Sequence, residues 1–262
     1  MLSYAPLESN RFGLKTLRGT IEGALDCKAL AGALIEHRAD LAIIRLPARH
    51  SHEIHGLYPL GLHPIHADTL VTYHCDLAAC ASGPTREGRS QIRLAERSDV
   101  DGISELIRHA FDNYANHYHS NPVLSPESIL AGYEEWALGH LSDPDKVVWI
   151  AVQDGRVAGI SCSAYDQSRG TCDYVLAGVH PDFSGAGIYT ELIRYNQRYF
   201  CERGFKTLRM STQVSNLTSQ HVMVRTGFVL AHAFDTYHIN AMFLRDPERM
   251  DAVRKACEMT SD

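Results

Sequence analysis

Apolar and polar positions recur with two different periods over residues 1–79. Leu30 and Leu34 are spaced for one face of a helix, and Asp26 before them can cap its start. From residue 69 to 77, apolar and polar side chains alternate, which is typical of a half-buried strand. The pattern predicts a small αβαβ unit, with a helix after Asp26, a strand over 41–46, a helix over 48–58 and a strand over 69–77.

The rest of the chain alternates between strand-like and helix-like segments. Ser98, with Asp101 three residues later, indicates a variant capping box before a helix that ends near Phe111. Asp154-Gly155 between two apolar runs is typical of a two-residue hairpin turn. The predicted elements are a strand over 92–95, a helix over 100–111, a helix carrying Tyr133 and Trp136, strands over 147–152 and 157–165, a strand over 207–214, a helix over 217–225, a strand over 228–243 and a helix over 247–259.

Residues 171–203 combine a strand, a glycine-bearing loop and an amphipathic helix. The strand ends in an apolar run over 175–179 suited to burial on both faces, and Pro181 stops it because proline has no N–H to donate. Gly185-Ala186-Gly187 then opens the helix. Such a loop directs unpaired N–H groups and the positive end of the helix dipole to one point, which suits a pyrophosphate. A tight turn that binds nothing is the alternative.

A change in composition divides the chain. Residues 80–91 gather Ser, Gly, Pro and charged residues without periodicity, which indicates a linker. We therefore expect a small α/β N-terminal domain at 1–79, a linker at 80–90 and a second domain at 91–262. With 262 residues, of which 45% are apolar, the chain is long enough for two cores.

Net charge and composition argue against several classes of partner. The formal net charge is −6 and the pI is near 6.2, whereas nucleic acids and anionic membranes need a basic face. No apolar stretch has membrane-spanning length, and the N-terminal segment lacks the basic start and apolar core of a signal peptide. The seven cysteines form no C-x-x-C pair, which favours free thiols in a reducing compartment. We expect a cytoplasmic protein that binds neither nucleic acid nor membrane.

Histidines crowd the N-terminal part of the chain. On a helix His52 and His55 share one face, but no Cys or Asp at ligand spacing completes a site. We therefore expect no metal.

The order of elements after residue 91 resembles that of the GCN5-related N-acetyltransferase (GNAT) family. Three features carry the resemblance over residues 91–244: Val179 two residues before Pro181, the loop motif from Ser184 to Tyr189, and Asn216 eleven residues before Gly227. The resemblance implies an α/β (α+β) fold, in which a mixed, mostly antiparallel sheet splays open at the central strand and is flanked by helices.

The same resemblance implies a site for acetyl-CoA. In the family, the pantetheine arm pairs with the exposed strand backbone and the pyrophosphate sits in the loop. Carried over to this chain, Val179 lies beside the acetyl group and Asn216 faces the pantetheine arm. The predicted coenzyme-binding residues are Val179, Ser184, Gly185, Ala186, Gly187, Ile188, Tyr189, Thr190, Asn216 and Met223.

Three of these positions depart from the family pattern. Ser184 stands where Gln or Arg is usual, and Tyr189 stands where Gly or Ala is usual, which puts a ring near the phosphates. Met223 occupies the place where many members carry a Tyr that protonates the departing thiolate, and a thioether cannot donate a proton. Proton delivery by water, proton delivery by another group and a site without catalysis are the alternatives.

Acetyl transfer needs a base for the attacking amine and donors for the oxyanion and the thiolate. Strand periodicity predicts that Asp173 shares a face with Ala177 and Val179. In histone-acetylating relatives a Glu near that place acts as the base, whereas a solvated carboxylate at a strand end is the plain alternative. Tyr165 and Tyr174 are similarly placed. We name Asp173 and Tyr165 as the catalytic candidates.

In relatives, the segment between the first helix and the hairpin forms one wall of the acceptor pocket. Aromatic side chains beside polar groups suit a sugar or nucleotide ring, and they suit an ordinary helix-loop core equally well. The predicted acceptor-binding residues are Tyr114, His117, Tyr118, Tyr133 and Trp136.

The small N-terminal domain and Tyr133-x-x-Trp136 together look like the TDP-fucosamine acetyltransferase type, which would make the acceptor a nucleotide-linked aminosugar. We expect an acetyl-CoA-dependent N-acetyltransferase acting by direct attack, since no Cys-His or Ser-His arrangement is evident. An amino acid, a polyamine and an aminoglycoside are the rival acceptors, and a non-catalytic acyl-CoA-binding regulatory module is the rival class. The oligomeric state stays open, with a homodimer as one option.

Overall fold

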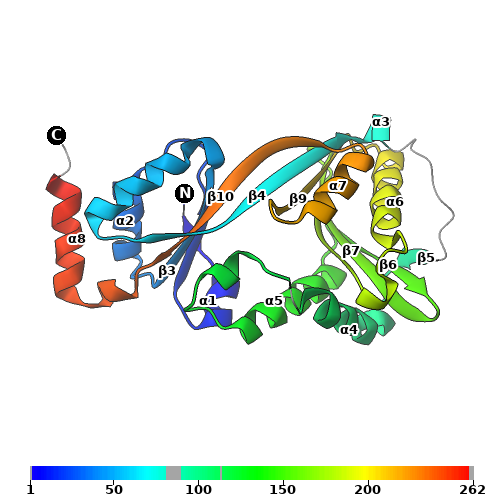
Figure 1. Ribbon diagram of the computed structural model, residues 1–262, viewed down its shortest axis with the longest axis horizontal. Helices are drawn as coiled ribbons and strands as arrows, with labels where there is room; N and C mark the ends of the chain where they lie inside the picture. The colour runs from blue at the N-terminus through cyan, green and yellow to red at the C-terminus, as the bar shows by residue number, and fades with distance from the viewer. Residues whose placement is uncertain (1, 81–89, 113, 260–262) are drawn as a thin grey trace. The chain divides into compact units, whose positions relative to one another are not determined.

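The computed structural model describes residues 2–80, 90–112 and 114–259, and the chain forms two compact units (Figure 1). Unit 1 consists of residues 1–70, 115–128 and 233–262, and unit 2 of residues 71–114 and 129–232. The two units are not separated at a single linker, because residues 115–128 and 233–262 cluster with the N-terminal residues. The predicted linker at 80–90 lies outside the described residues except at its ends, so the domain boundaries stay a prediction.

Unit 1 is built on a sheet with helices on its faces. Its elements are β1 (Ser3–Tyr4), α1 (Pro6–Phe12), β2 (Thr16–Thr20), α2 (Cys27–Glu36), β3 (Leu41–Pro47), η1 (Ala48–Leu60), the first part of β4 (Pro64–Asp76), η3 (His117–Ser120), the second part of β10 (Val229–Asn240), η6 (Met242–Arg245) and α8 (Pro247–Met259). The strand order is β1-β2-β3-β10-β4. Leu34, Ile44 and Leu57, from α2, β3 and η1, are fully buried in one core.

Unit 2 carries the remaining strands. Its elements are the second part of β4, α3 (Leu77–Cys80), β5 (Gln91–Leu94), η2 (Arg97–Asp99), α4 (Val100–Phe111), most of α5 (Pro126–Gly139), η4 (His140–Ser142), β6 (Lys146–Gln153), β7 (Arg156–Asp166), β8 (Thr171–Val179), η5 (Pro181–Phe183), α6 (Ile188–Glu202), β9 (Thr207–Gln213), α7 (Leu217–Arg225) and the first part of β10. The strand order is β4-β9-β8-β7-β6-β5, and β8 is parallel to β9 while β5 to β8 pair antiparallel. A mixed, mostly antiparallel sheet with flanking helices confirms the predicted fold class.

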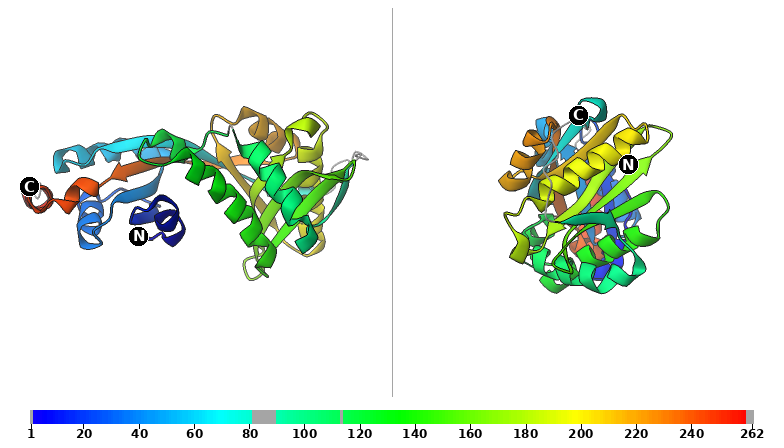
Figure 2. Two further views of the ribbon diagram at one scale, coloured as in Figure 1. Left: turned by 90° about the horizontal axis from the view of Figure 1, so that it is seen from below. Right: turned by 90° about the vertical axis from the view of Figure 1, so that its right-hand side faces the viewer.

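Helices pack against the sheet of unit 2 (Figure 2), and two glycines of the sheet lie where this approach is closest to the backbone. A Cβ built on Gly159 of β7 would lie 2.6 Å from Ile188 at the start of α6. A Cβ built on Gly178 of β8 would lie 3.1 Å from the Phe111 ring at the end of α4. Because Gly159 pairs with Val179, the neighbour of Gly178, these two glycines face opposite sides of the sheet. Helices α6 and α4 therefore cover opposite faces.

Several local predictions are confirmed. Asp26 caps α2 by accepting a 2.9 Å hydrogen bond from the Ala29 N–H. Asp154 and Gly155 join β6 to β7 with φ of 52° and 74°, the left-handed conformation that a tight hairpin turn requires. Helix α8 covers residues 247–259, as the pattern predicts.

Other local predictions are wrong. The capping box before α4 joins Glu96 and Asp99, not Ser98 and Asp101, because the turn begins as a short 3-10 helix. Strand β8 is not buried on both faces: Cys172, Tyr174 and Leu176 are buried and the residues between them are half-exposed.

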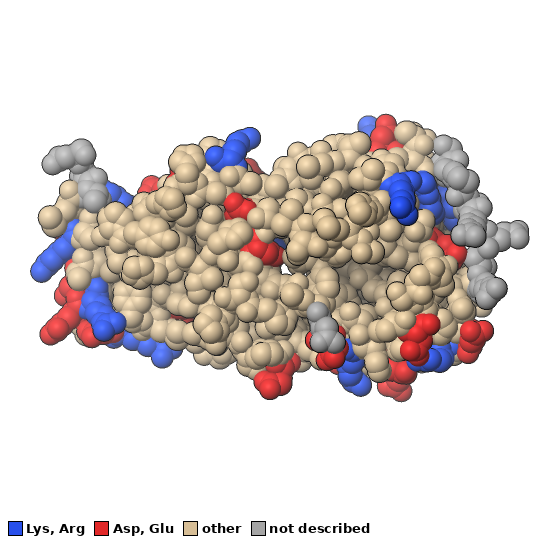
Figure 3. Space-filling model, viewed as in Figure 1, with Lys and Arg blue, Asp and Glu red and all other residues tan. Residues whose placement is uncertain are grey.

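Charged side chains on the visible face of the molecule do not gather by sign. On the face shown in Figure 3, acidic and basic side chains of the described residues are interspersed. Over the described ranges, no helix combines the length and apolar character needed to cross a bilayer.

Candidate active site

Strands β8 and β9 pair over only part of their length. The parallel ladder joins Thr171–Tyr174 to Thr207–Met210, although β8 continues to Val179 and β9 to Gln213. Beyond Tyr174 the two strands therefore diverge, and the β9-facing backbone groups of residues 175–179 have no ladder partner on β9. This opening is the predicted splay, and it presents a strand edge to any ligand that can hydrogen-bond with it.

A β-bulge lies at the start of the splay. On β7, Ser163 pairs with Tyr174 and Cys162 pairs with Leu176, so Val175 is the extra residue. The bulge reverses which face the following side chains occupy. Tyr174 lies near Tyr189 of α6, whereas Val175 and Leu176 both pack in the core beneath α4.

The bulge also corrects the predicted placement of Asp173. This residue precedes the bulge and faces the α4 side, whereas Val179 follows it and faces α6 through its pairing with Gly159. The expectation that Asp173 shares a face with Ala177 and Val179 is therefore wrong. Both Asp173 oxygens accept from Arg209 on β9, with Nε and Nη2 each at 2.7 Å, and both side chains are half-exposed. The role of Asp173 as a base stays a prediction.

The loop between β8 and α6 has the backbone of an anion cradle. Gly185 and Gly187 adopt φ of 79° and 88°, which side chains with a Cβ rarely adopt. Ser184 donates its N–H to the Pro181 carbonyl at 3.0 Å, and residues 184–187 are exposed. The first N–H groups of α6 have no acceptor inside the helix, and the helix dipole adds to their attraction for an anion. The loop therefore can bind a phosphate through its backbone.

The three residues that follow the loop are placed differently from one another. Ile188 is buried against the sheet and offers only its backbone. Thr190 is half-buried. Tyr189 points toward α7, where its hydroxyl lies 2.7 Å from Ser219 Oγ. Tyr189 as a whole is half-buried, and burial around its hydroxyl raises the pKa of Tyr189 to about 12.

Asn216 organises the entry to α7. Its Oδ1 accepts the Ser219 N–H at 3.1 Å, which caps the helix, and its Nδ2 donates to Thr212 Oγ1 at 3.0 Å. The same Nδ2 lies 3.5 Å from the Tyr114 hydroxyl, which donates to Gln213 Oε1 at the end of β9. Asn216 therefore positions α7 and Tyr114 beside the splay.

Met223 and Tyr165 are packed side chains. Met223 lies one helical turn after Ser219 on the same face of α7, and it is 1% exposed. The Tyr165 hydroxyl donates to the Pro144 carbonyl at 2.7 Å, and its ring packs on Phe205. Tyr165 pairs with Cys172, at the end of β8 away from the loop, so the structure does not bring it to the splay.

The structure brings together three of the five predicted acceptor residues. Tyr133 stacks on Phe111 with ring centroids 4.4 Å apart, and Tyr114 and Trp136 flank Tyr133 at 6.2 and 6.5 Å. Trp136 is 43% exposed, so the cluster has a solvent-facing ring. Tyr114 and Tyr133 pack against the core beneath α4, the same side of the sheet as Asp173.

The other two predicted acceptor residues belong to unit 1. His117 is buried, and its Nδ1 lies 2.9 Å from His238 Nε2. Burial lowers the pKa of His117 well below 6.5, and burial with the nearby Arg18 charge lowers that of His238 to about 4. Tyr118 donates its hydroxyl to Glu8 at 3.2 Å. Both predicted residues are therefore engaged within unit 1.

A buried polar layer between β7, β8 and α6 was not predicted. Asn196 of α6 donates to Ser161 and accepts from Ser163, each at 3.0 Å. The Tyr174 hydroxyl is buried there, and no described group meets it in normal hydrogen-bond geometry. Polar residues inside a helix pattern were the only sequence signal, and helix faces often carry such residues without function.

One group of acidic and histidine side chains in the described part of unit 2 has the spacing of metal ligands. Glu105, His109 and His180 offer ligand atoms within 4.8 Å of one another. The Arg156 Nη2 lies 3.4 Å from both Glu105 Oε1 and His180 Nε2, so a guanidinium already occupies the cation position. His180 Nδ1 accepts the Asp182 N–H at 3.2 Å, so Nε2 is the ring nitrogen that faces the guanidinium. The group does not suit a metal.

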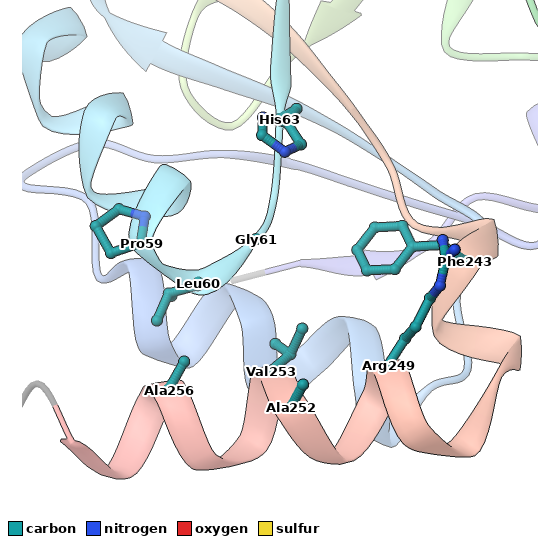
Figure 4. Close-up of a pocket in the computed structure, with 9 residues that line it drawn as sticks. All are labelled: Pro59, Leu60, Gly61, His63, Phe243, Arg249, Ala252, Val253 and Ala256. Atoms are coloured by element: carbon teal, nitrogen blue, oxygen red, sulfur yellow. The ribbon is translucent and has the colours of Figure 1, made fainter.

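The described residues of unit 1 line cavities at two places, and no residue of the glycine loop lines either of them. The first, about 470 Å³, lies between the end of η1 and α8, where Leu60 faces Val253 and Ala256 (Figure 4). The second, about 390 Å³, is lined by Ser51, Tyr58 and Tyr237 among others.

Comparison with known proteins agrees with the geometry of unit 2. Residues 105–228 match the model of the acetyltransferase (GNAT) family. The chain is 27% identical over 146 residues to the spore coat polysaccharide biosynthesis protein SpsD of Bacillus subtilis, covering 55% of this chain and 48% of that protein. It is 34% identical over 74 residues to an acetyltransferase of Pectobacterium atrosepticum, covering 28% and 50%. The chain thus spans about half the length of these curated relatives.

Solved structures share the fold. A GCN5-related N-acetyltransferase of Sphaerobacter thermophilus matches with a TM-score of 0.59 and 15% identity, over 90% of this chain and 74% of that chain. A tandem GNAT protein from the clavulanic acid biosynthesis pathway matches with a TM-score of 0.59 and 15% identity, over 86% and 75%. At this identity the likeness concerns the fold alone. Residues 105–228 therefore resemble the acetyltransferase (GNAT) family in sequence, and the chain shares its fold with solved GNAT proteins.

Proposed function

We propose that the chain transfers an acetyl group from acetyl-CoA to the amine of a small acceptor by direct attack. The observation that carries this proposal is the splay between β8 and β9, which opens beside the glycine loop and the start of α6. A strand edge can pair with the amides of a pantetheine arm, and the loop can bind the pyrophosphate at one end of that arm. Both features lie inside residues 105–228.

The coenzyme-binding residues follow from this arrangement. The backbone N–H groups of Gly185 and of residues 187–190 hold the pyrophosphate, while those of Ser184 and Ala186 close the loop on Pro181 and Phe183. Because backbone groups do the binding, Ser184 can replace a longer polar side chain. Val179 lies at the loop end of the splayed edge, and Asn216 holds the start of α7 beside it. The acetyl carbonyl is polarised by backbone donors of the strand edge, which stabilise the oxyanion as it forms.

The attacking amine must be neutral and must lose a proton. Asp173 is the candidate base, because it faces the same side of the sheet as the aromatic cluster of Tyr114 and Tyr133. Its carboxylate is held by Arg209 until a cationic acceptor replaces the guanidinium. Since Met223 has no proton to give, a water molecule passes a proton to the coenzyme thiolate, and the proton that Asp173 took from the amine restores that water.

We further propose a nucleotide-linked aminosugar as the acceptor. Two observations support this substrate class: the relationship to a protein of spore coat polysaccharide biosynthesis, and the exposed Trp136 beside stacked Tyr133 and Phe111. Aromatic faces bind sugar and base rings by stacking. Amino acids, polyamines and aminoglycosides are the rival acceptors, and the reaction is proposed to take place in the cytoplasm.

A second function is favoured by specific residues. Tyr189 stands where the family pattern has a small side chain, and Met223 has no proton to donate to the thiolate. Arg209 forms an ion pair with Asp173, the candidate base. These features suit a module that binds acyl-CoA without turning it over.

Ligand-linked stability separates these functions. Acetyl-CoA at about 100 times its dissociation constant adds about 2.7 kcal/mol of stability, visible as a higher melting temperature. No shift with any acyl-CoA contradicts both functions. If the shift occurs, thiol release is followed with TDP-aminosugars, amino acids, polyamines and aminoglycosides. Release with an aminosugar supports the enzyme, whereas binding without release from any acceptor supports the regulatory module.

A further inference from the structure

We infer that Tyr189 gates the proposed coenzyme groove: its ring bridges α6 and α7 across the path of the pantetheine arm, and the arm binds only when the ring swings out. The inference rests on the proposed function, because it assumes that the arm runs from the glycine loop to the splayed edge of β8.

One end of the gate is fixed by a hydrogen bond. Tyr189 is the second residue of α6, directly after the loop, and its hydroxyl lies 2.7 Å from Ser219 Oγ on α7. Ser219 is itself held, because its N–H donates to Asn216 Oδ1 at 3.1 Å. The phenol therefore spans the distance between the start of α6 and the first turn of α7.

The ring also reaches the base of the splay. Tyr189 lies close enough to Tyr174 to influence its ionisation, and Tyr174 is the last β8 residue paired with β9. On the other side, Asn216, which holds Ser219, lies 3.5 Å from the Tyr114 hydroxyl, and that hydroxyl donates to Gln213 at the end of β9. The ring thus lies among β8, the end of β9 and α7, the space into which the pantetheine arm must enter to reach residues 175–179.

The gate can open without unfolding anything. The surroundings of the Tyr189 hydroxyl are enclosed, whereas the residue as a whole is only half-buried. The hydrogen bond between the neutral hydroxyls of Tyr189 and Ser219 holds the ring in the closed position. The loss of such a bond shifts the equilibrium between the closed and open ring about fivefold. If only a fraction of the molecules has the ring open, the apparent affinity for the coenzyme equals the affinity of the open form multiplied by that fraction.

Opening would also change the chemistry around Tyr174. The buried Tyr174 hydroxyl has no partner in normal geometry among the described residues. When the Tyr189 ring leaves, this hydroxyl becomes a donor at the base of the groove. A carbonyl of the pantetheine arm is the kind of acceptor that would satisfy it.

The test compares acetyl-CoA binding by the full chain and four variants. Tyr189→Ala removes the ring and the bond, Tyr189→Phe removes the hydroxyl alone, and Ser219→Ala removes its partner. Tyr195→Phe is the matched control, because Tyr195 lies on the same helix but packs on Trp149. Calorimetry measures the dissociation constant, stopped-flow measures the binding rate, and circular dichroism checks that each variant is folded.

We expect Tyr189→Ala to bind acetyl-CoA at least about tenfold more tightly, and Tyr189→Phe and Ser219→Ala about fivefold more tightly. The observed binding rate of the wild type should reach a plateau at high acetyl-CoA concentration, because ring opening limits it. The rate for Tyr189→Ala should keep rising with acetyl-CoA concentration. Tyr195→Phe should match the wild type.

Two results overturn the gate. If wild type and all variants bind acetyl-CoA alike, with rates linear in concentration, the gate is wrong and the proposed function stands. If none of them binds acetyl-CoA, the coenzyme site itself is wrong. Tight binding by Tyr189→Ala alone supports the gate and shows that wild type is held closed.

Discussion

The buried imidazole pair of unit 1 predicts a loss of stability in mild acid. His117 and His238 lie in contact inside unit 1, and neither can accept a proton there without placing a charge in the core. The pKa of His238 is about 4 in the folded protein and near 6.5 when unfolded. Below pH 6.5 the unfolded chain therefore binds the extra proton, and folding stability falls with pH until about pH 4.

The magnitude follows from these two values. Between pH 8 and pH 5, proton uptake by unfolded His238 costs about 2 kcal/mol of folding stability, and His117 adds to the loss with the same sign. The assay is urea unfolding of the full chain followed by far-ultraviolet circular dichroism at pH 8 and pH 5. Tryptophan fluorescence is less suitable, because both tryptophans lie in unit 2.

The matched variants isolate the imidazole from other acid effects. His238→Gln keeps a polar group beside His117 but cannot titrate, so its loss of stability between the two pH values should be about 2 kcal/mol smaller than that of wild type. His74→Gln changes an exposed histidine and should lose as much as wild type. Equal pH dependence in His238→Gln and wild type would refute the argument that burial keeps His238 neutral.

Three further variants test the site. Gly159→Ala places a Cβ 2.6 Å from Ile188, so it should destabilise the fold by about 1–3 kcal/mol in thermal melting and weaken acetyl-CoA binding in calorimetry. Gly23→Ala, which places its Cβ in open space, should change neither. Asp173→Asn should lower kcat/KM about 100-fold at pH 7, and Asp166→Asn should leave it within threefold; equal rates remove Asp173 as the base. Met223→Tyr should raise kcat at least about tenfold over Met223→Phe in thiol-release assays, because the introduced side chains differ only in the hydroxyl. Equal rates in these two variants would show that the lack of a proton donor at position 223 does not limit the reaction.

The glycine loop shows what local chemistry can predict. Gly185 and Gly187 have positive φ, and few other residues adopt that backbone, so their place in the sequence marks the turn before α6. The hairpin at Asp154-Gly155 was predictable for the same reason. Amphipathic helices such as α4 are equally visible, because their buried residues recur at helical spacing.

The bulge shows what local chemistry could not predict. Val175 is an ordinary strand residue, and only its pairing with β7 makes it the extra one. That pairing decides which face Asp173 occupies, so counting by two from Val179 placed the candidate base on the wrong side. The acceptor prediction met a similar limit: His117 and Tyr118 are near Tyr114 in sequence, but their contacts lie with His238 and Glu8 in unit 1.

Amide hydrogen exchange with and without acetyl-CoA locates the bound coenzyme on the chain. We expect slower exchange at two places, the splayed edge over residues 175–179 and the loop and helix start over residues 184–190. Control peptides from β5 and β6 should exchange unchanged, because they lie at the other edge of the sheet of unit 2. Unchanged exchange at both predicted places, with acetyl-CoA bound, would contradict a coenzyme site at the splay.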